Sequence, residues 1–229
     1  MFGQHHKERL EKEKNARTRA EQQEKAELEQ EYGLAGIEDR EALQRKLEDI
    51  VSKGIFLGAD KNSEKYKIMQ DACFELSRYA DSLSAHFAIE TGPETSLTLK
   101  NFLDSLNSTG VAVNLDPANF VMVTKEDPVY AVHTLKDYIV HTHAKDGIML
   151  KQTEPKIIYD FFAEGGIGDL RLDEYFKEVP LGQGQVDFDA YIKALSDIGY
   201  NGYLTVEREV GDNPYGDIEM AVKFLQKYI

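Results

Sequence analysis

The chain has 229 residues, and its 41 Asp and Glu residues outnumber its 27 Lys and Arg residues, giving a formal net charge of −14. This excess of negative charge argues against general nucleic-acid binding and against attraction to an anionic membrane. The sequence has no apolar run near the roughly 18 residues of a membrane span, no apolar signal-peptide segment, and a single cysteine, so we expect a cytoplasmic protein.

The N-terminal part of the sequence differs in character from the rest. Residues 5–31 are almost wholly polar and rich in good helix formers. Apolar residues such as Leu10 and Leu28 are too sparse there for a continuous coiled-coil seam. We therefore expect a charged helical or disordered arm over residues 1–36 and a globular domain over residues 37–229.

The globular pattern begins with a helical stripe of apolar residues that stops at Gly54. Residues 55–59 (IFLGA) predict a short buried strand. A strongly amphipathic helix follows, with Ser63 as its N-cap. Cys73 falls on the apolar face of this helix, which predicts a buried thiol.

After residue 85, short apolar strands alternate with amphipathic helices. Strands are predicted at residues 86–90, 111–116, 138–143 and 202–207. One helix begins at Asp127-Pro128, an N-cap followed by proline at the first helical position. A longer insertion occupies residues 147–180. The alternation predicts a parallel sheet with helices packed outside it.

Each predicted strand ends in a side chain that can bind a metal ion: Glu90, Asp116, His143 and Glu207. The first three are 26 and 27 residues apart, about one strand–helix unit each. In a parallel barrel the C-terminal ends of all strands lie on one face, so these side chains are expected to converge. Three carboxylates and an imidazole suit Mn²⁺ best, with Mg²⁺, Co²⁺ and Zn²⁺ as alternatives.

Three neighbours of the predicted histidine ligand have expected roles near the substrate. Lys145 and Asp146 follow His143 and are expected to reach the polar end of a substrate. Alternation places His141 on the same strand face as His143, so His141 is expected to pack inside the barrel, to orient the site or to contact the substrate.

Two further features near the predicted strand ends allow structural readings. The turn from Gly182 to Gly184 either brings backbone close to a ligand or is a simple tight turn. Arg208 should point away from Glu207 if the strand continues, so a structural role is expected for this arginine.

The strings AIETGPET, NLDPAN, HTHAKD, PLGQGQVDF and YNGYLTVERE occur in this order along the chain. Together they resemble the sugar phosphate isomerase/epimerase family of xylose-isomerase-like TIM barrels, over residues 63–229. The resemblance implies a divalent metal held by Glu90, Asp116, His143 and Glu207. It also implies that the two glutamates act as acid and base on opposite faces of the substrate. Asn119 stands where sugar epimerases of the family often carry a histidine, and it is expected to contact the substrate.

This resemblance implies a metal-dependent isomerase or epimerase of a small sugar or sugar phosphate. The reaction would transfer a proton next to a metal-bound carbonyl. A metal that bridges the carbonyl and hydroxyl oxygens would stabilise the enediolate. A carboxylate on each side of the carbon could take a proton from one face and return one to the other.

The chain departs from the family pattern, because a full eight-unit barrel takes roughly 200 to 250 residues. Four units occupy residues 86–229, which leaves 85 residues for the others, and the first 36 of these resemble a charged arm. We therefore expect an α/β fold with an incomplete (β/α) barrel, comprising the last four to five units. An open sheet exposes its edges, which favours a homodimer that pairs two half-barrels. The alternative is a truncated, weakly active or inactive barrel that serves as an interaction module.

Overall fold

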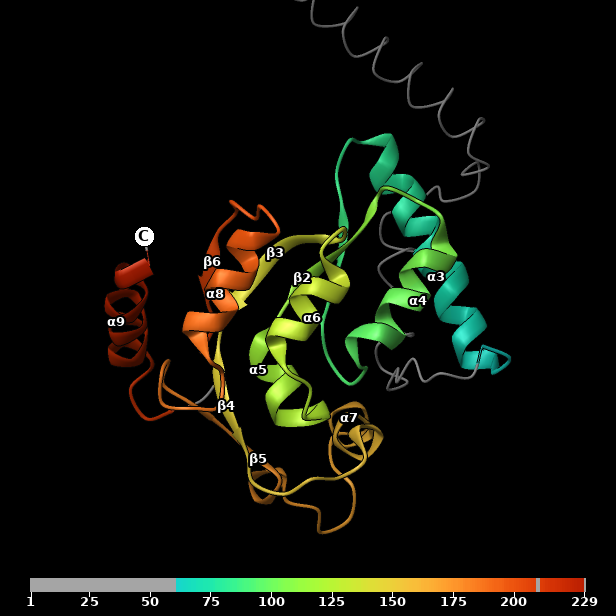
Figure 1. Cartoon of the computed structure of the whole chain (residues 1–229). Coiled ribbons are helices and arrows are strands. Elements are labelled where there is room, and N and C mark those ends of the chain that lie inside the picture. Colours follow the sequence, from blue (N-terminus) through green and yellow to red (C-terminus); the bar gives the residue numbers. More distant parts are fainter. Residues whose placement is uncertain (1–60, 209–210, 229) are drawn as a thin grey trace, which may run out of the picture. The chain divides into compact units, whose positions relative to one another are not determined.

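A computed structural model of the chain describes residues 61–208 and 211–228 (Figure 1). All of these residues belong to one compact unit, Lys46–Ile229. The predicted arm at 1–36 and the predicted strand at 55–59 lie outside the described residues. Within the described ranges, no helix is long and apolar enough to cross a bilayer.

The central element is a four-stranded parallel sheet with the strand order β1-β2-β3-β6. Its strands are β1 (Phe87–Glu90), β2 (Val111–Leu115), β3 (Ile139–Ala144) and β6 (Leu204–Val206). They coincide with the strands predicted from the alternating pattern, and the parallel arrangement is confirmed. A shift of register interrupts the pairing of β2 with β3 between Val113 and Asn114.

The helices follow the strands along the chain. They are α3 (Glu64–Ser82), α4 (Ser96–Leu106), α5 (Pro117–Asn119), α6 (Pro128–Leu135), α7 (Pro155–Glu164), α8 (Phe188–Asp197) and α9 (Pro214–Leu225), with the short turns η1 (Phe120–Thr124), η2 (Leu172–Glu174) and η3 (Gln226–Tyr228). Helix α4 contacts α3 and α6, and α6 contacts α8, so these helices form a layer beside the sheet (Figure 1).

Polar side chains define where several helices begin. The Ser63 hydroxyl accepts a hydrogen bond of 3.2 Å from the backbone N–H of Tyr66. The Asp127 carboxylate accepts one of 2.9 Å from the N–H of Val129, directly before Pro128. These caps satisfy backbone donors that have no partner inside the helix, and both predicted helix starts are confirmed.

The main core lies between the sheet and the helix layer. Leu115 of β2, Phe102 of α4 and Tyr191 of α8 are among its fully buried members. Cys73 of α3 is 8% exposed, and burial raises the pKa of its thiol to about 12. The prediction of a buried thiol at this position is therefore confirmed.

The insertion at residues 147–180 has a structure of its own that the sequence analysis left open. Together with the preceding Asp146 it forms an antiparallel hairpin, β4 (Asp146–Met149) with β5 (Phe176–Val179), and helix α7 between the two strands. A second apolar cluster supports it, in which Ile158 of α7 packs with Met122 and Val123 of η1. The insertion therefore lies against the segment that follows β2.

Candidate metal centre

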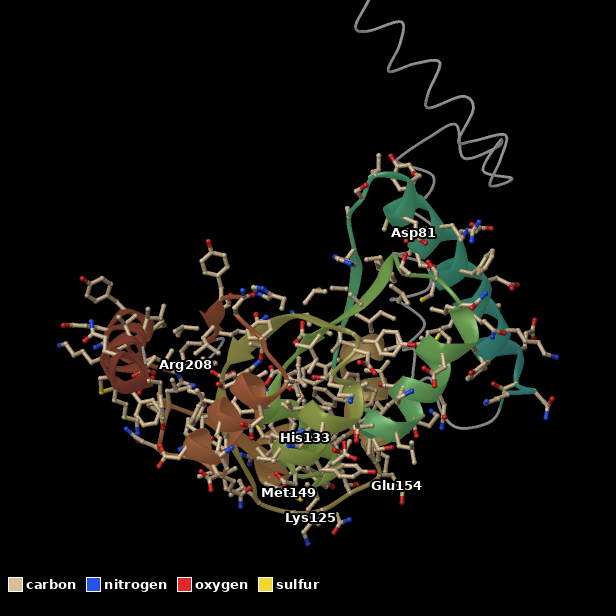
Figure 2. The ribbon with its side chains drawn as sticks, turned by 45° about the horizontal axis from the view of Figure 1, so that its top comes forward. Asp81, Lys125, His133, Met149, Glu154 and Arg208 are labelled. Atoms are coloured by element: carbon tan, nitrogen blue, oxygen red, sulfur yellow. The ribbon has the colours of Figure 1, made fainter. Side chains whose placement is uncertain are left out.

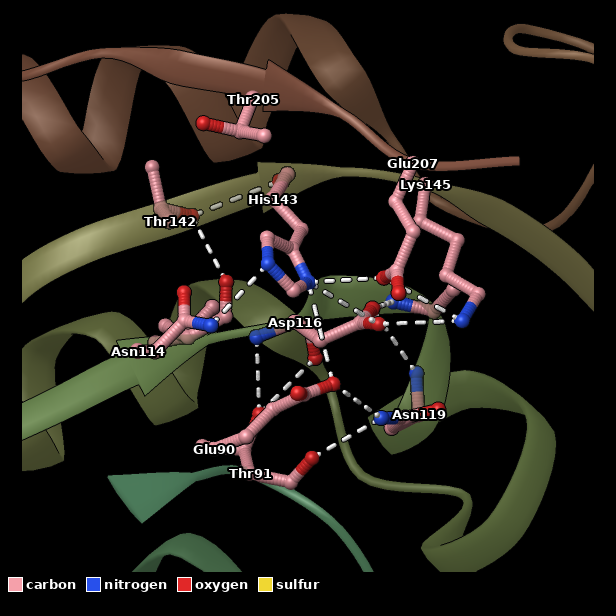
Figure 3. Close-up of polar contacts among 12 residues, drawn as sticks. Glu90, Thr91, Asn114, Asp116, Asn119, Thr142, His143, Lys145, Thr205 and Glu207 are labelled. Atoms are coloured by element: carbon pink, nitrogen blue, oxygen red, sulfur yellow. Dashed lines mark hydrogen bonds and ion pairs between the residues drawn. The ribbon is translucent and has the colours of Figure 1, made fainter. Parts of the chain in front are cut away.

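The four residues predicted at the strand ends come together in space. Glu90, Asp116, His143 and Glu207 each offer a ligand atom, and these atoms all lie within 4.8 Å of one another. Nδ1 of His143 is 2.8 Å from Oε2 of Glu207, 3.6 Å from Oδ2 of Asp116 and 3.7 Å from Oε1 of Glu90 (Figure 3). The parallel register of β1, β2, β3 and β6 produces this convergence, as expected for strand ends on one face.

Asp116 presents one oxygen to the cluster and uses the other to start a helix. Its Oδ1 accepts hydrogen bonds of 2.7 Å from the N–H of Ala118 and 3.3 Å from the N–H of Asn119. The backbone N–H of Asp116 in turn donates to the Thr91 hydroxyl at 2.8 Å. With Oδ1 and the backbone held, the fully buried carboxylate has a fixed orientation, and Oδ2 faces His143.

Glu90 is held by the segment that follows β2. The Asn119 amide donates to Oε1 of Glu90 at 3.5 Å and to the backbone carbonyl of Thr91 at 2.9 Å. Asn119 also lines the cavity beside the cluster, so its predicted role in substrate binding remains a proposal. Its contacts already make it a support for the Glu90 carboxylate.

One ring nitrogen of His143, Nε2, has a hydrogen-bond partner, and the other, Nδ1, has none among the described residues. Its Nε2 lies 3.0 Å from the side-chain nitrogen of Asn114, while Oδ1 of Asn114 is buried without a hydrogen-bond partner among the described residues. The nitrogen and oxygen of an amide are assigned from the hydrogen-bond network. Turning the Asn114 amide by 180° places its oxygen at Nε2, where it accepts the Nε2–H. This tautomer leaves a lone pair on Nδ1, which faces the carboxylates.

The donor atoms fit a divalent cation. Oδ2 of Asp116, Nδ1 of His143 and Oε2 of Glu207 are buried and have no hydrogen-bond partner among the described residues. Donors bonded to Mg²⁺ or Mn²⁺ at about 2.1 Å lie roughly 3 to 4 Å apart, close to the separations seen here. Buried polar atoms normally have hydrogen-bond partners, whereas these atoms make only ion-pair contacts with one another and with Lys145. Such convergence suits shared ligation of one cation.

Lys145 lies behind the cluster and is 4% exposed. Its ammonium is 3.3 Å from Glu207, 3.7 Å from Asp116 and 3.8 Å from Glu178 of β5. This places the predicted substrate-contacting lysine at the cavity wall, surrounded by carboxylates. Glu178 was not identified from the sequence, because nothing in the insertion distinguishes its glutamates from solvated ones.

Arg208 also contacts Glu178, the carboxylate that lies beside Lys145. It donates to Glu178 at 2.6 Å and to Asp217 of α9 at 2.7 Å, and its side chain is 9% exposed. Arg208 is labelled in Figure 2. The predicted structural role of Arg208 is confirmed by these contacts. They connect α9 to the insertion and, through Glu178, to Lys145.

Asp146 and His141 lie close to the cluster but already have protein partners. The buried Asp146 carboxylate accepts four backbone hydrogen bonds, from the N–H groups of Gly147, Gly182, Gly184 and Val186. The turn at Gly182–Gly184 is thus wrapped around Asp146, which favours the reading of a tight turn. His141 pairs with the Thr205 hydroxyl at 2.8 Å, and its ring centre is 6.0 Å from that of His143. Contact of either side chain with a substrate stays a prediction.

The clustering of buried carboxylates shifts the pKa values of Glu90 and His143. Burial raises the pKa of Glu90, and the charges of Asp116 and Glu207 raise it further, against the effects of His143 and Lys145. Burial disfavours the imidazolium of His143, but the three surrounding carboxylates outweigh it and raise the pKa of this histidine. The cluster therefore attracts positive charge, which protons and a cation would compete to supply.

Comparison with known proteins decides the family. The sequence profile of the xylose isomerase-like TIM barrel family matches residues 11–228. The chain belongs to this family. The match starts well before residue 63, the expected start of the resemblance, and the parallel sheet with its helices agrees with it.

Individual relatives are distant. An inosose dehydratase of Clostridium perfringens (strain 13 / Type A) is 26% identical over 196 residues, which cover 84% of this chain and 62% of that protein. The chain spans between one half and two thirds of the length of such curated relatives. Among solved structures, a xylose isomerase domain protein from Planctomyces limnophilus matches with a TM-score of 0.57 and 25% identity, covering 75% of this chain and 54% of that one.

A second solved structure shares the fold at lower identity. It is a xylose isomerase-like TIM barrel protein from Mycobacterium smegmatis in complex with magnesium, with a TM-score of 0.51 and 18% identity. The match covers 69% of this chain and 50% of that one. At this identity the likeness concerns the fold alone.

Proposed function

We propose that this protein is a divalent-metal-dependent enzyme of small polyhydroxylated ketones that moves a proton on the carbon next to the carbonyl, as an isomerase or epimerase. The observation that carries this proposal is the convergence of Glu90, Asp116, His143 and Glu207, whose ligand atoms lie within 4.8 Å of one another. Family membership supports it, because the chain shares the fold of sugar-modifying enzymes.

The four residues would hold the cation through Oε1 of Glu90, Oδ2 of Asp116, Nδ1 of His143 and Oε2 of Glu207. When bound, the metal would polarise the carbonyl and stabilise the negative charge that develops on its oxygen. Mn²⁺ is the first choice, since an oxygen-rich set with one imidazole suits it, and Mg²⁺, Co²⁺ and Zn²⁺ are the alternatives.

Glu90 and Glu207 are the proposed acid and base. They come from the first and last strands of the sheet order, and both line the cavity next to the cluster. Burial and neighbouring carboxylates raise the pKa of Glu90, which brings a carboxyl group closer to the range where it can both give and take a proton. Two carboxyl groups on opposite sides of one carbon suit removal of a proton from one face and its return to the other.

Lys145 is the proposed partner of the substrate's polar end. Its ammonium lies at the cavity, 3.3 Å from Glu207. There it can donate to a hydroxyl or carbonyl oxygen while it offsets the charge of the carboxylates. Asn119, His141 and Asp146 are proposed as positioning residues. Asn119 contacts Glu90, His141 links β3 to Thr205 of β6, and Asp146 holds the Gly182–Gly184 turn.

Dehydration is a second candidate, because the curated relatives reported above are named inosose dehydratases. It begins with the same proton removal next to a carbonyl, after which a hydroxyl group leaves from the adjacent carbon. The two outcomes differ in the product. An epimerase keeps every hydroxyl group and inverts one carbon, whereas a dehydratase forms a conjugated enone and water.

One experiment separates these candidates. The protein is treated with chelator, reloaded with Mn²⁺, and incubated in D₂O with a panel of ketoses, ketose phosphates and cyclic polyhydroxy ketones. Proton NMR follows exchange next to the carbonyl, and ultraviolet absorbance follows enone formation. We expect Glu90→Gln and Glu207→Gln to lower exchange at least 100-fold. The control Glu219→Gln, an exposed glutamate of α9 paired with Lys223, should retain it.

The contrary result is equally clear. If protein with one metal per chain catalyses no exchange on any member of the panel, the reading of an inactive barrel that serves as an interaction module replaces this proposal. A homodimer and a cytoplasmic location stay predictions. Light scattering measures the first, and cell fractionation measures the second.

A further inference from the structure

A cavity of about 730 Å³ opens beside the candidate metal centre. Its lining includes Glu90, Lys145 and Glu207 together with a group of apolar side chains, which form its apolar wall. The apolar wall includes Met122, Ile158, Tyr159, Phe162 and Phe176. Cavities of roughly 300 to 1,000 Å³ hold drug-sized ligands, so this space exceeds what a single small sugar needs.

Most of the apolar wall comes from the insertion at residues 147–180, and Met122 comes from η1. Ile158 of α7 is 2% exposed and packs against Met122 and Val123, so α7 lies against η1. Tyr159 lies over Gly92, since a Cβ at Gly92 would be 2.7 Å from the tyrosine hydroxyl oxygen. Gly92 comes two residues after Glu90 in the chain. The tyrosine ring is thereby held close to the strand end that carries the proposed acid–base group.

Phe162 extends this wall outward. Its ring meets that of Tyr159 edge to face, with 6.4 Å between the ring centres, and the residue is 61% exposed. A large aromatic side chain at the rim of a cavity offers a surface on which a planar or apolar ring can stack. Exposed apolar groups that line a concave surface commonly mark ligand contacts.

The protein groups that line the cavity carry more negative than positive charge. Among the described residues that line it, Lys145 and Lys177 are the cations, against Glu90, Asp173, Glu178 and Glu207. Lys145 already lies within 4 Å of three carboxylates. Phosphate sites normally use arginine forks, lysines or helix N-termini, and the apolar wall supplies none of these.

We propose that the apolar wall is a subsite for an uncharged ring, so that the substrate is a hydroxyketone with a bulky apolar or aromatic substituent and no phosphate. The hydroxyketone end lies at the metal centre, and the ring packs on Tyr159 and Phe162. This inference rests on the proposed function for the position of the polar end. The specificity for the ring rests on the insertion alone.

A matched pair of probes tests the subsite: 2-hydroxyacetophenone and hydroxyacetone share the hydroxyketone and differ in phenyl against methyl. Calorimetric titration of Mn²⁺-loaded protein should give roughly 10- to 100-fold tighter binding of the phenyl compound. Phe162→Ser should reduce this preference at least threefold, and Phe162→Trp should keep it. Tyr203→Ser, at an aromatic residue that is 83% exposed and outside the cavity lining, is the matched control.

Three results would overturn the proposal. They are equal binding of the two ketones, a phenyl preference that Phe162→Ser leaves unchanged, and tighter binding of dihydroxyacetone phosphate than of the phenyl ketone. The titrations are repeated on metal-free protein, and the metal content is measured separately. Absence of metal binding refutes the proposed function, whereas a phenyl preference that depends on Phe162 supports the subsite with or without metal.

Discussion

The parallel sheet and the insertion at residues 147–180 contribute different chemistry to the same cavity. The strand ends contribute the four side chains that could bind a metal ion; among them Asp116 is fully buried and His143 lies close to Glu207. The insertion brings Tyr159 and Phe162, whose rings are partly or largely exposed. A rigid sheet fixes reacting groups, and a separate segment shapes what fits beside them. Reaction and substrate choice can therefore vary independently on this fold.

Charged contacts couple the two regions. Glu178 of β5 lies 2.6 Å from Arg208 and 3.8 Å from Lys145. Asp146, which opens β4, holds the turn at Gly182–Gly184 through its carboxylate. The insertion is therefore linked to the sheet through these buried groups as well as through its apolar cluster.

The largest effect on metal binding is expected when a strand end loses one of its predicted metal ligands. His143→Ala removes the nitrogen at the centre of the cluster, so Mn²⁺ affinity measured by calorimetry should fall at least 100-fold. His133→Ala, on the exposed face of α6 (labelled in Figure 2), should bind Mn²⁺ like the unaltered protein. Equal loss in both variants would indicate general damage to the fold and would contradict the assigned ligand.

The next effect tests how the insertion is attached. Asp146→Asn replaces a carboxylate oxygen by an NH₂ group that faces backbone donors, so the free energy of unfolding should fall by about 3 kcal/mol. Urea denaturation measures it. Asp173→Asn, in the exposed part of the same insertion, should change stability little. If Asp146→Asn kept full stability and only weakened substrate binding, the direct role predicted from the sequence would replace the loop-anchoring role.

A moderate effect on metal affinity is expected from Asn114, which lies 3.0 Å from Nε2 of His143. Asn114→Leu removes the acceptor for Nε2–H of His143, and metal affinity should fall about 10- to 100-fold. Asn114→Asp still offers an acceptor, so it should stay within a few-fold of the unaltered protein. Similar losses in both variants would show that Asn114 contributes packing and does not set the tautomer.

The last prediction concerns helix α3, whose residues do not line the cavity, and it involves no change to the metal centre. Because burial raises the pKa of Cys73 to about 12, almost no thiolate is present at pH 8 in the folded protein. A disulfide reagent should label Cys73 at least 100-fold more slowly in buffer than in urea. Rapid labelling of the folded protein would show that α3 opens readily from the core.

The two regions also differ in how well the sequence predicts them. Glu90, Asp116, His143 and Glu207 were predicted because a parallel sheet brings strand ends to one face whatever the helices contain. Asn114 was missed because its position depends on the register shift after Val113, which has no clear sequence signal. In physical terms, periodicity encodes the strands, whereas irregular pairing arises from tertiary packing.

The insertion was predicted at residues 147–180, but its hairpin and helix were missed for a different reason. Its strands are short, and β5 (Phe176–Val179) mixes charged and apolar residues without a long alternation. The role of Asp146 depends on the N–H groups of Gly182 and Gly184, more than 30 residues away. Contacts at such a distance along the chain cannot be read from local pattern, so a buried carboxylate was predicted to contact substrate.

The most direct test of the central claim is anomalous diffraction from crystals of the protein grown with Mn²⁺. The account predicts one strong anomalous peak per chain, about 2.0 to 2.4 Å from donor atoms of Glu90, Asp116, His143 and Glu207. A fully loaded crystal with no peak at these four side chains, or with its manganese bound elsewhere, would contradict it.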